Sequence, residues 1–260
     1  MYTLHVSPRK VTLILLALVT GLLLGGVSTK YIKYVHGHDL GLVRLFDLEG
    51  EGNLPSWYSS FLLLLSSALL GIIGLNRKRE ANPYGWHWLA LALIFLYLSM
   101  DEGAGIHEMA NPLIRRWLKT TGYLDSVLRV IRPVWLLAGI PFAVIVFLVF
   151  WRFLLHLPIA TRAQFLIAGG LYIGGAIGVE AVAGHYYALH GRHTLTYQIL
   201  VAFEDGLEMV GLVVFLYALL LYMATRGIRF QVVVNTDPPS PVSPVKTVDE
   251  RDRGQLAGTV

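Results

Sequence analysis

Cysteine is absent from the 260-residue sequence. This absence excludes disulfides, iron–sulfur clusters, thiolate metal sites and cysteine nucleophiles. Charge is also scarce, because charged residues make up 15% of the chain against 55% hydrophobic residues, with a mean hydropathy of +0.59. Soluble domains have a more even balance. The composition therefore predicts an integral membrane protein whose main partner is the lipid bilayer.

The basic residues form no single patch, although the formal net charge is +4. The 21 Lys and Arg residues are scattered between apolar runs, which argues against a nucleic-acid partner. The sequence also has no internal repeat, no Gly-rich phosphate loop and no G-x-S-x-G motif. Common signatures of nucleotide binding and of serine hydrolases are thus missing.

Six apolar segments are long enough to cross a bilayer as helices, since a hydrocarbon core of about 30 Å needs roughly 20 helical residues. We therefore predict an all-α, polytopic integral membrane protein with six transmembrane helices in a domain over 1–229. The six segments lie at about 11–29, 56–75, 86–108, 133–155, 163–186 and 196–224.

Six spans place both termini on one side of the membrane, and the basic residues at segment ends favour the cytoplasm. Arg77, Lys78 and Arg79 follow the second segment, and Arg226 and Arg229 follow the sixth. Other Lys and Arg residues on the opposite side weaken this assignment. The first segment also has features of a signal peptide, whose cleavage would leave five spans.

Two stretches fall outside the predicted spans. Residues 109–132 mix apolar side chains with Arg and Lys at near-helical spacing, which is typical of an amphipathic segment at the outer membrane interface. Residues 230–260 are rich in Pro and charge and have too few apolar side chains to order themselves. We interpret them as a disordered cytoplasmic tail.

Three glutamates from three predicted helices reach one depth. Counted at about 1.5 Å per helical residue from the cytoplasmic ends of their segments, Glu102, Glu180 and Glu208 all lie about 24–25 Å up. A carboxylate at that depth costs roughly 2.5–3.5 kcal/mol unless it is paired, protonated or bound to a cation. We therefore expect the three glutamates to share one site in the outer half of the bilayer.

A second polar layer lies above these glutamates. His107, His185 and Glu204 lie about 30–33 Å up by the same count. Glu102–x4–His107 and Glu180–x4–His185 repeat one spacing, although five residues turn about 140° away from the same face of a straight helix. Glycine permits the kinks that would bring each pair together. The glycines in question are Gly103, Gly105 and Gly184.

Imidazole and carboxylate groups without thiolate form a ligand set that suits iron, zinc or manganese, as a divalent or di-metal centre. The predicted metal ligands are Glu102, His107, Glu180, His185 and Glu208, with Glu204 as a further ligand or the catalytic general base. Asp101, Glu108 and Asp205 flank them and are expected to bond the ligands or to lie at a solvated rim. A hydrogen-bonded polar plug and a proton or ion path remain alternative readings.

The stretch "DLEGEGNLPSWY" precedes the second segment and resembles the start of an EF-hand loop. Asp47, Glu49 and Glu51 stand at its first, third and fifth positions, but Tyr58 stands where calcium binding requires a glutamate. We interpret this stretch as a polar turn that leads into the membrane.

Two segments, "FLYLSMDEGAGIHE" and "FEDGLEMVGLVVFLYALLLY", carry a family resemblance. They resemble bacterial multipass membrane proteins that have a Leu-Ser-x-Asp-Glu-x4-His-Glu segment and a late Glu-[Glu/Asp]-Gly-x-Glu-Met segment. The resemblance covers roughly 86–110 and 165–225 and implies a bacterial inner membrane location, but no reaction. Its matching positions are Asp101, Glu102, His107, Glu108, Glu204, Asp205 and Glu208.

The sequence favours a metal-dependent membrane enzyme that acts on a lipid-like or membrane-soluble substrate, with the bound metal polarising oxygen or activating water. The main alternative is a proton- or cation-coupled transporter that uses the same glutamates. A third reading is an accessory subunit whose polar cluster specifies assembly with a membrane-protein partner or with further copies of the chain.

Overall fold

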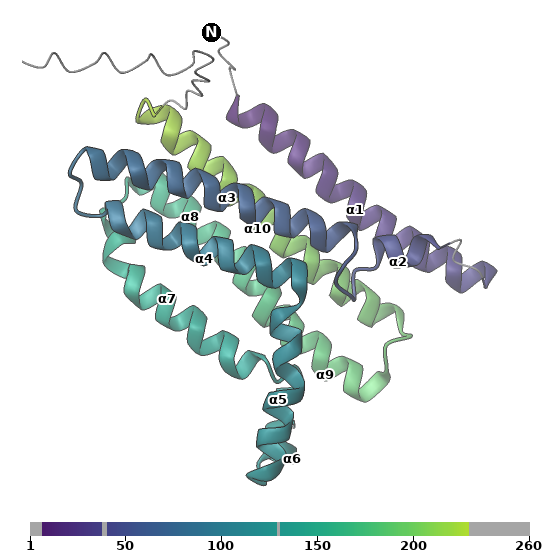
Figure 1. The fold of residues 1–260 in the computed structure, drawn as a ribbon. Coiled ribbons are helices and arrows are strands. Elements are labelled where there is room, and N and C mark those ends of the chain that lie inside the picture. Colours follow the sequence, from purple (N-terminus) through teal and green to yellow (C-terminus); the bar gives the residue numbers. More distant parts are fainter. Residues whose placement is uncertain (1–6, 38–40, 129–130, 229–260) are drawn as a thin grey trace, which may run out of the picture. The chain divides into compact units, whose positions relative to one another are not determined.

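A computed structural model of the chain describes residues 7–37, 41–128 and 131–228. Within these residues the chain forms helices and no strand, so the predicted all-helical fold is confirmed. The helices are α1 (Pro8–His36), α2 (Leu42–Phe46), α3 (Leu54–Arg79), α4 (Gly85–Ala104), α5 (Ile106–Thr120), α6 (Leu124–Leu128), α7 (Leu136–His156), α8 (Ile159–Ile173), the π-helix η1 (Gly174–Val179), α9 (Glu180–His190) and α10 (Leu195–Thr225) (Figure 1). The tail predicted over 230–260 lies outside the described residues.

Five of the described helical stretches are long and apolar enough to cross a membrane. They are Pro8–Lys33, Leu54–Arg79, Leu136–His156, Ile159–His190 and Leu195–Thr225. The pair formed by α4 and α5 passes the same test only when the two are taken together, and they are bent by 78° at Gly105. The predicted number of six therefore holds only if this bent pair counts as one span.

The third predicted segment, 86–108, is not one continuous helix. Helix α4 ends at Ala104, and the residues that follow belong to α5, which turns away from the bundle (Figure 1). Helix α5 is amphipathic, and Met109, Leu113 and Trp117 are exposed along one of its sides at a spacing of four residues. An apolar stripe of this kind suits the boundary between lipid and water.

Helix starts are marked in the sequence by residues that accept hydrogen bonds from free backbone N–H groups. The Asn53 side chain accepts a hydrogen bond from the Ser56 backbone nitrogen at 2.9 Å, and Pro55 follows in the first turn of α3. The Thr194 hydroxyl accepts one from Tyr197 at 3.3 Å at the start of α10. These caps set where the two helices that flank the polar site begin.

Helices α3 and α4 form a closely packed antiparallel pair, and α10 packs against α8, α1 and α3 (Figure 1). Serines tie the α3–α4 pair together, because Ser60 and Ser99 each donate a hydrogen bond to the other's backbone carbonyl, at 2.7 and 2.8 Å. Ser67 donates to the carbonyl of Ala92 at 2.7 Å. Small hydroxyl residues thus let two helix backbones approach while their polar groups stay satisfied.

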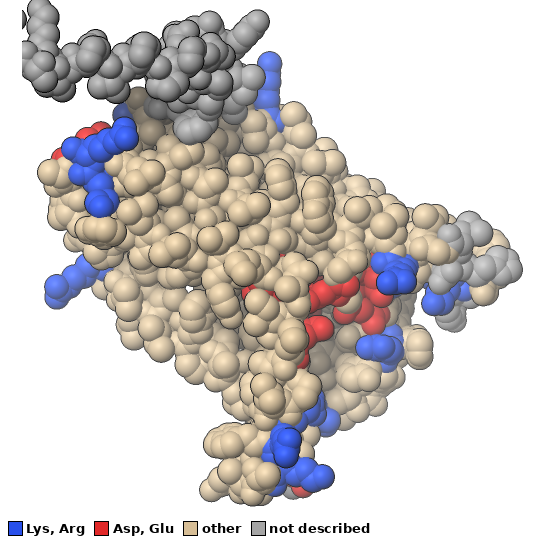
Figure 2. Space-filling model, viewed as in Figure 1, with Lys and Arg blue, Asp and Glu red and all other residues tan. Residues whose placement is uncertain are grey.

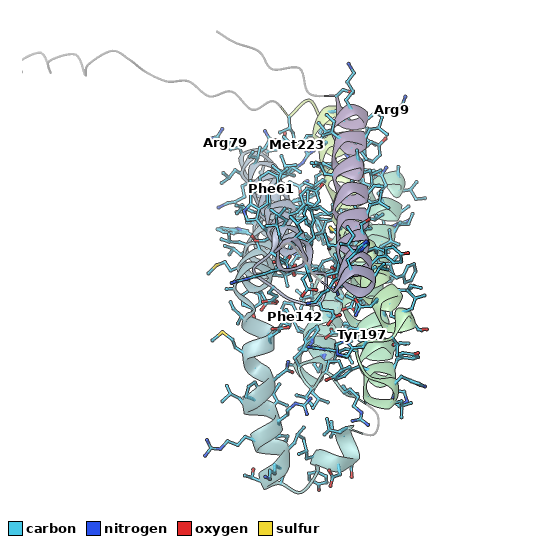
Figure 3. All side chains as sticks on the ribbon, turned by 90° about the vertical axis from the view of Figure 1, so that its right-hand side faces the viewer. Arg9, Phe61, Arg79, Phe142, Tyr197 and Met223 are labelled. Carbon is cyan, nitrogen blue, oxygen red and sulfur yellow. The ribbon has the colours of Figure 1, made fainter. Side chains whose placement is uncertain are left out.

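Apolar side chains fill the interior in two clusters and also cover the outer faces. One cluster centres on Trp88 and Phe153, and the other on Leu62 and Met209. Large apolar side chains such as Phe142 are exposed on the outer faces, and Figure 3 shows side chains projecting from both sides of the helices. A surface that is apolar on the outside as well as the inside is typical of helices surrounded by lipid.

A glycine-to-alanine pair tests the packing of α8 on α10. A Cβ at Gly211 would lie 2.9 Å from both the Ala168 carbonyl oxygen and the Tyr172 nitrogen, which are backbone atoms of α8. We expect Gly211→Ala to cost about 1–3 kcal/mol, because two helix backbones must move apart. Thermal unfolding in detergent, followed by tryptophan fluorescence, measures the effect.

The matched control is Gly169→Ala on α8, where a Cβ would meet no atom within 4 Å. This variant should unfold at the wild-type temperature or slightly above it, since alanine favours a helix. Equal midpoints for the two variants would contradict the close packing of α8 and α10.

Candidate functional site

The turn between α4 and α5 is built on Gly105. This residue has φ 64° and ψ 36°, a left-handed conformation that glycine adopts without steric cost, and its N–H donates to the Asp101 carbonyl at 2.8 Å. A Cβ here would overlap with Oε2 of Glu51. Gly105 therefore both ends α4 and leaves room for a carboxylate.

His107 lies in the first turn of α5 and is held by Asp101 from the last turn of α4. Its backbone N–H donates to Oδ1 of Asp101 at 2.8 Å, and its ring Nδ1 lies 3.1 Å from Oδ2. Because an ionised carboxylate only accepts hydrogen bonds, Nδ1 donates, and Nε2 remains available for other chemistry. The arrangement fixes the ring across the break between the two helices.

Glu51 faces the other side of the same imidazole. Its Oε1 lies 3.5 Å from Nε2 of His107, and its side chain is 21% exposed. Burial raises the pKa of Glu51 to about 7, an effect that His107 opposes and that Glu108 and Asp101 reinforce. This carboxyl therefore changes its charge near neutral pH.

Sequence reasoning missed Glu51, because it treated residues 47–58 as a polar turn. One signal was present: the short connection 80–84 makes the second and third segments antiparallel neighbours. The residues before the second segment must then lie beside the end of the third. Glu51 and the "SMDEGAGIHE" stretch meet for that reason.

The inner part of the site consists of carboxylates from α4, α9 and α10. Glu208 lies within electrostatic range of Glu102, Glu204, Asp205 and Glu180. Glu102 and Glu180, which were predicted to share its depth, are among these neighbours. Glu204 and Asp205 lie on the same helix as Glu208, about one turn away.

The π-helix η1 positions Glu180, which is the first residue of α9. Within η1, Gly175 packs directly on α10, since a Cβ there would lie 2.8 Å from both the Glu204 carbonyl oxygen and Cγ of Glu208. Single π turns of this kind are often found at functional sites. The wider turn and its glycine bring α9 against the acidic stretch of α10.

Trp135 connects the inner and outer parts of the site. Its indole Nε1 donates to Oε1 of Glu180 at 2.8 Å, and its ring lies 5.0 Å from the His107 ring. Its backbone N–H donates to the Asn111 side chain of α5 at 3.0 Å. One aromatic residue thus bridges α5, α9 and the start of α7.

Cations lie at the rim of the site and pair with the acidic residues of the loop before α3. Lys30 lies 3.0 Å from Asp47 and 2.9 Å from Glu49, and Arg192 lies 3.6 Å from Glu49. Gln198 donates a further hydrogen bond to Glu49. Figure 2 shows Asp and Glu gathered on one face of the molecule with Lys and Arg beside them.

The structure does not bring His185 to the cluster. This predicted ligand is exposed and makes no hydrogen bond, ion pair or ring contact with another described residue. The reason is that α9 runs without a break from Glu180 to His190, so a spacing of five residues turns His185 away from Glu180. Glu102 and His107 share the spacing, but the break at Gly105 lies between them.

Gly184 also has a different role from the predicted kink. A Cβ on this residue would lie 2.8 Å from Cδ of Pro133, so the glycine allows the chain before α7 to pack on α9. Glu108 is exposed and lies within electrostatic range of Glu51 and Glu180. Its position is that of a rim residue.

No three His, Asp or Glu side chains among the described residues converge closely enough to hold a metal ion. The predicted ligand set of Glu102, His107, Glu180, His185 and Glu208 is therefore not assembled around one point. What the site offers is a group of carboxylates beside an oriented imidazole.

A family model described as a domain of unknown function (DUF8692) matches residues 11–223. The chain belongs to this family. The match includes every helix that contributes a residue to the site, so the whole site lies within the DUF8692 domain. Neither the curated proteins nor the solved structures contain a match to the chain. The bacterial origin implied by the motif resemblance stays a prediction.

Alanine at Gly105 tests the contact between this glycine and Glu51. We expect Gly105→Ala to be more destabilising than Gly122→Ala, although both residues have a positive φ, of 64° and 77°. Each variant bears a left-handed penalty of about 1–2 kcal/mol, but a Cβ at Gly122 meets nothing within 4 Å. A double-mutant cycle of thermal unfolding with Glu51→Ala isolates the contact. If Gly105→Ala lowered the stability equally in the wild type and in Glu51→Ala, the contact between Gly105 and Glu51 would be ruled out.

The pKa of Glu51 predicts a pH dependence of stability. Its folded-state value of about 7 lies above the ordinary 4.5, so the folded protein holds this proton more tightly than the unfolded chain does. The stability contributed by the protonated group is complete below about pH 4.5 and is lost as the pH rises through 7. Glu51→Gln should therefore flatten the fall of the unfolding midpoint over this range, measured at several pH values. Asp125→Asn, an exposed carboxylate on α6, should leave the profile unchanged.

Proposed function

We propose that this protein is an integral membrane protein whose carboxylate cluster binds and releases protons, as in a proton-coupled carrier. The observation that carries the proposal is a group of acidic side chains within electrostatic range of one another. Glu51 and Asp101 lie on either side of His107, both are within range of Glu102, and Glu102 is within range of Glu208. The apolar outer faces of the helices support a lipid environment. Basic residues lie at the C-terminal ends of α3 and α10, away from the carboxylate cluster, and they favour cytoplasmic termini.

The inner carboxylates lack cationic partners among the described residues. The ion pairs formed there involve Asp47, Glu49, Glu80 and the two carboxylates beside His107, and none involves Glu102, Glu204 or Glu208. A charged carboxylate in a low-dielectric interior needs a proton or a cation to offset its lost hydration. Repulsion between neighbouring carboxylates adds to that requirement.

Glu51 and His107 provide a route between this cluster and the aqueous rim. Glu51 exchanges its proton near neutral pH, since burial raises its pKa to about 7. The imidazole of His107 lies between Glu51 and Asp101, at 3.5 and 3.1 Å, and has a nitrogen on each side. Histidine in such a position can accept a proton at one nitrogen and release one from the other.

The broken helix is a second feature that favours a carrier. Helices interrupted within a membrane often form the ion and substrate sites of transporters. Here the N-terminal turn of α5 faces the Asp101 carboxylate, which the partial positive charge of a helix N-terminus stabilises. Movement of α5 about Gly105 would change the distance between His107 and Glu51.

A metal-dependent membrane enzyme is the second candidate, and the Asp101–His107 pair favours it. Histidine ligands of metals commonly donate their second ring nitrogen to a carboxylate in this way. His107, Glu51 and Glu102 would have to move closer together to hold the ion, which would supply Lewis-acid or redox chemistry there. Iron, zinc or manganese would suit these donors, with Glu204 as the general base.

Infrared spectroscopy of the purified protein tests the proposal. Protonated carboxyl groups have a carbonyl stretch that shifts in heavy water, and we expect such a band to be present at neutral pH and reduced in Glu102→Gln/Glu208→Gln. Glu80→Gln, which changes an exposed carboxylate at the other end of α3, is the control and should leave the band unchanged. In liposomes, the double variant should lose proton uptake driven by a membrane potential.

Elemental analysis of the same preparations separates the two candidates. Stoichiometric iron, zinc or manganese in the wild type that is lost in Glu102→Gln/Glu208→Gln would favour the enzyme and contradict a protonated cluster. An infrared band that the double variant leaves intact would also contradict the proton site.

A further inference from the structure

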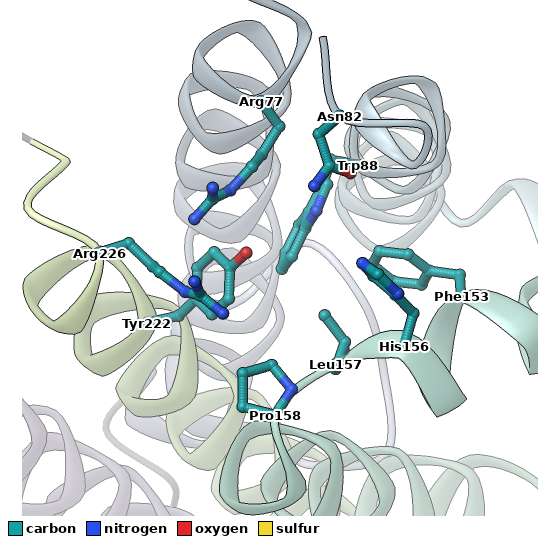
Figure 4. Close-up of a pocket in the computed structure, with 9 residues that line it drawn as sticks. All are labelled: Arg77, Asn82, Trp88, Phe153, His156, Leu157, Pro158, Tyr222 and Arg226. Atoms are coloured by element: carbon teal, nitrogen blue, oxygen red, sulfur yellow. The ribbon is translucent and has the colours of Figure 1, made fainter. Parts of the chain in front are cut away.

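A second polar site lies at the end of the helix bundle opposite the carboxylates. It is a cavity of about 120 Å³ where the ends of α3, α7 and α10 meet the starts of α4 and α8. This volume is well above what a single water molecule needs. Figure 4 shows Arg77, Tyr222 and Arg226 on one side of it and Asn82 and His156 on the other. Trp88, Phe153, Leu157 and Pro158 complete the lining, which contains no Asp or Glu.

Arg77 is buried in this cavity without enough acceptors. Its side chain is 9% exposed, and its Nη1 donates to the carboxylate of Glu80. Its Nε and Nη2 atoms are buried and have no hydrogen-bond partner among the described residues. A buried guanidinium donor left without an acceptor is costly, so the cavity is suited to a ligand that supplies one.

A second guanidinium shares an aromatic neighbour with the first. The Cζ atoms of Arg77 and Arg226 lie 5.3 and 5.7 Å from the centre of the Tyr222 ring. Two positive groups at one aromatic ring repel each other, and an anion bound between them would offset that repulsion. The ring offers cation–π attraction to both groups but cannot neutralise them.

Further donors face the same space. The Asn82 side-chain oxygen accepts from the Tyr84 backbone at 2.9 Å, so its amide nitrogen is left to donate. Trp88, whose indole N–H is a further neutral donor, also lines the cavity and is only 1% exposed. The cavity thus combines two guanidinium groups with neutral donors, and the Glu80 carboxylate is already paired with Arg77.

We propose that this cavity binds a phosphate group, as a free phosphate or as the phosphate of an anionic lipid headgroup. Guanidinium groups match the oxygens of phosphate with paired hydrogen bonds. The cavity also lies where lipid phosphates are found if these helices cross a bilayer, because the exposed basic residue Arg79 marks the same end of α3 (Figure 3). Basic pockets between the ends of transmembrane helices bind phospholipid headgroups in other membrane proteins.

Titration of the full-length protein in a neutral detergent tests the site. The probes are inorganic phosphate, with chloride at matched ionic strength, and short-chain phosphatidylglycerol, with phosphatidylcholine as its neutral counterpart. Tryptophan fluorescence, to which Trp88 in the cavity contributes, and the unfolding temperature report binding of either probe, and native mass spectrometry counts bound lipid. We expect saturable binding of phosphate or phosphatidylglycerol and none of chloride or phosphatidylcholine.

Three variants make the test specific. Arg226→Gln changes an exposed residue and Arg77→Gln changes the buried one, and each should weaken binding roughly tenfold or more. Arg79→Gln removes the same charge from the same end of α3 outside the cavity and should bind as the wild type does.

Binding of inorganic phosphate that depends on Arg226 would identify a free phosphate as a sufficient ligand. Binding of phosphatidylglycerol alone, with the same dependence, would identify the lipid headgroup. Equal weakening by Arg79→Gln would show diffuse charge attraction and overturn the proposal, as would the absence of saturable binding to the wild type. The carboxylate cluster contributes nothing to this test, so its outcome is independent of the proton site.

Discussion

The 78° turn at Gly105 places the charged groups of the carboxylate site. Because α4 ends there, the Asp101 carboxylate can accept a hydrogen bond from the first turn of α5, and the His107 ring folds back beside α4 instead of pointing away from it. The missing Cβ leaves space for Glu51 from the loop before α3. In a straight helix the side chains of Glu102 and His107 would point about 140° apart around the helix axis. Backbone conformation at one residue therefore determines which side chains meet.

Charge is compensated differently in the outer and inner parts of the site. At the rim, Lys30 and Arg192 pair with Asp47 and Glu49, and water can still reach these groups. Farther in, Glu208 lies within electrostatic range of Glu102 and Glu204, and no Lys or Arg is bonded to these glutamates in the described part of the chain. The inner part of the site therefore contains carboxyl groups without basic side chains bonded to them. At the other end of the bundle the polarity is reversed, because Arg77 and Arg226 line a cavity that has no carboxylate in its wall.

Helical class and the acidic character of the site could be predicted from the sequence, because long apolar runs and carboxylates within them follow from composition and spacing alone. The break at Gly105 was anticipated as a kink, since glycine was needed to join Glu102 to His107. His185 was expected beside Glu180 because the pair has the same spacing as Glu102 and His107. Helix α9 does not break between Glu180 and His185, so the two side chains point in different directions. Glu51 and Trp135 were missed because they approach the site through tertiary contacts, which local periodicity does not encode. The cavity lined by Arg77 and Arg226 forms where five helix ends meet, so no short stretch of the sequence predicts it.

The π-helix at Gly174–Val179 has a consequence for how this chain can tolerate length changes. A π turn is equivalent to one extra residue inserted into a regular helix. Removing that residue would restore an α-helix and rotate everything after it by about 100°. The α8 half could keep its packing on α10, whereas Glu180 would leave the indole of Trp135. Deletion of one residue in this stretch would therefore move the Glu180 carboxylate out of the site. The helix would remain apolar and almost as long as before, so it could still cross a membrane.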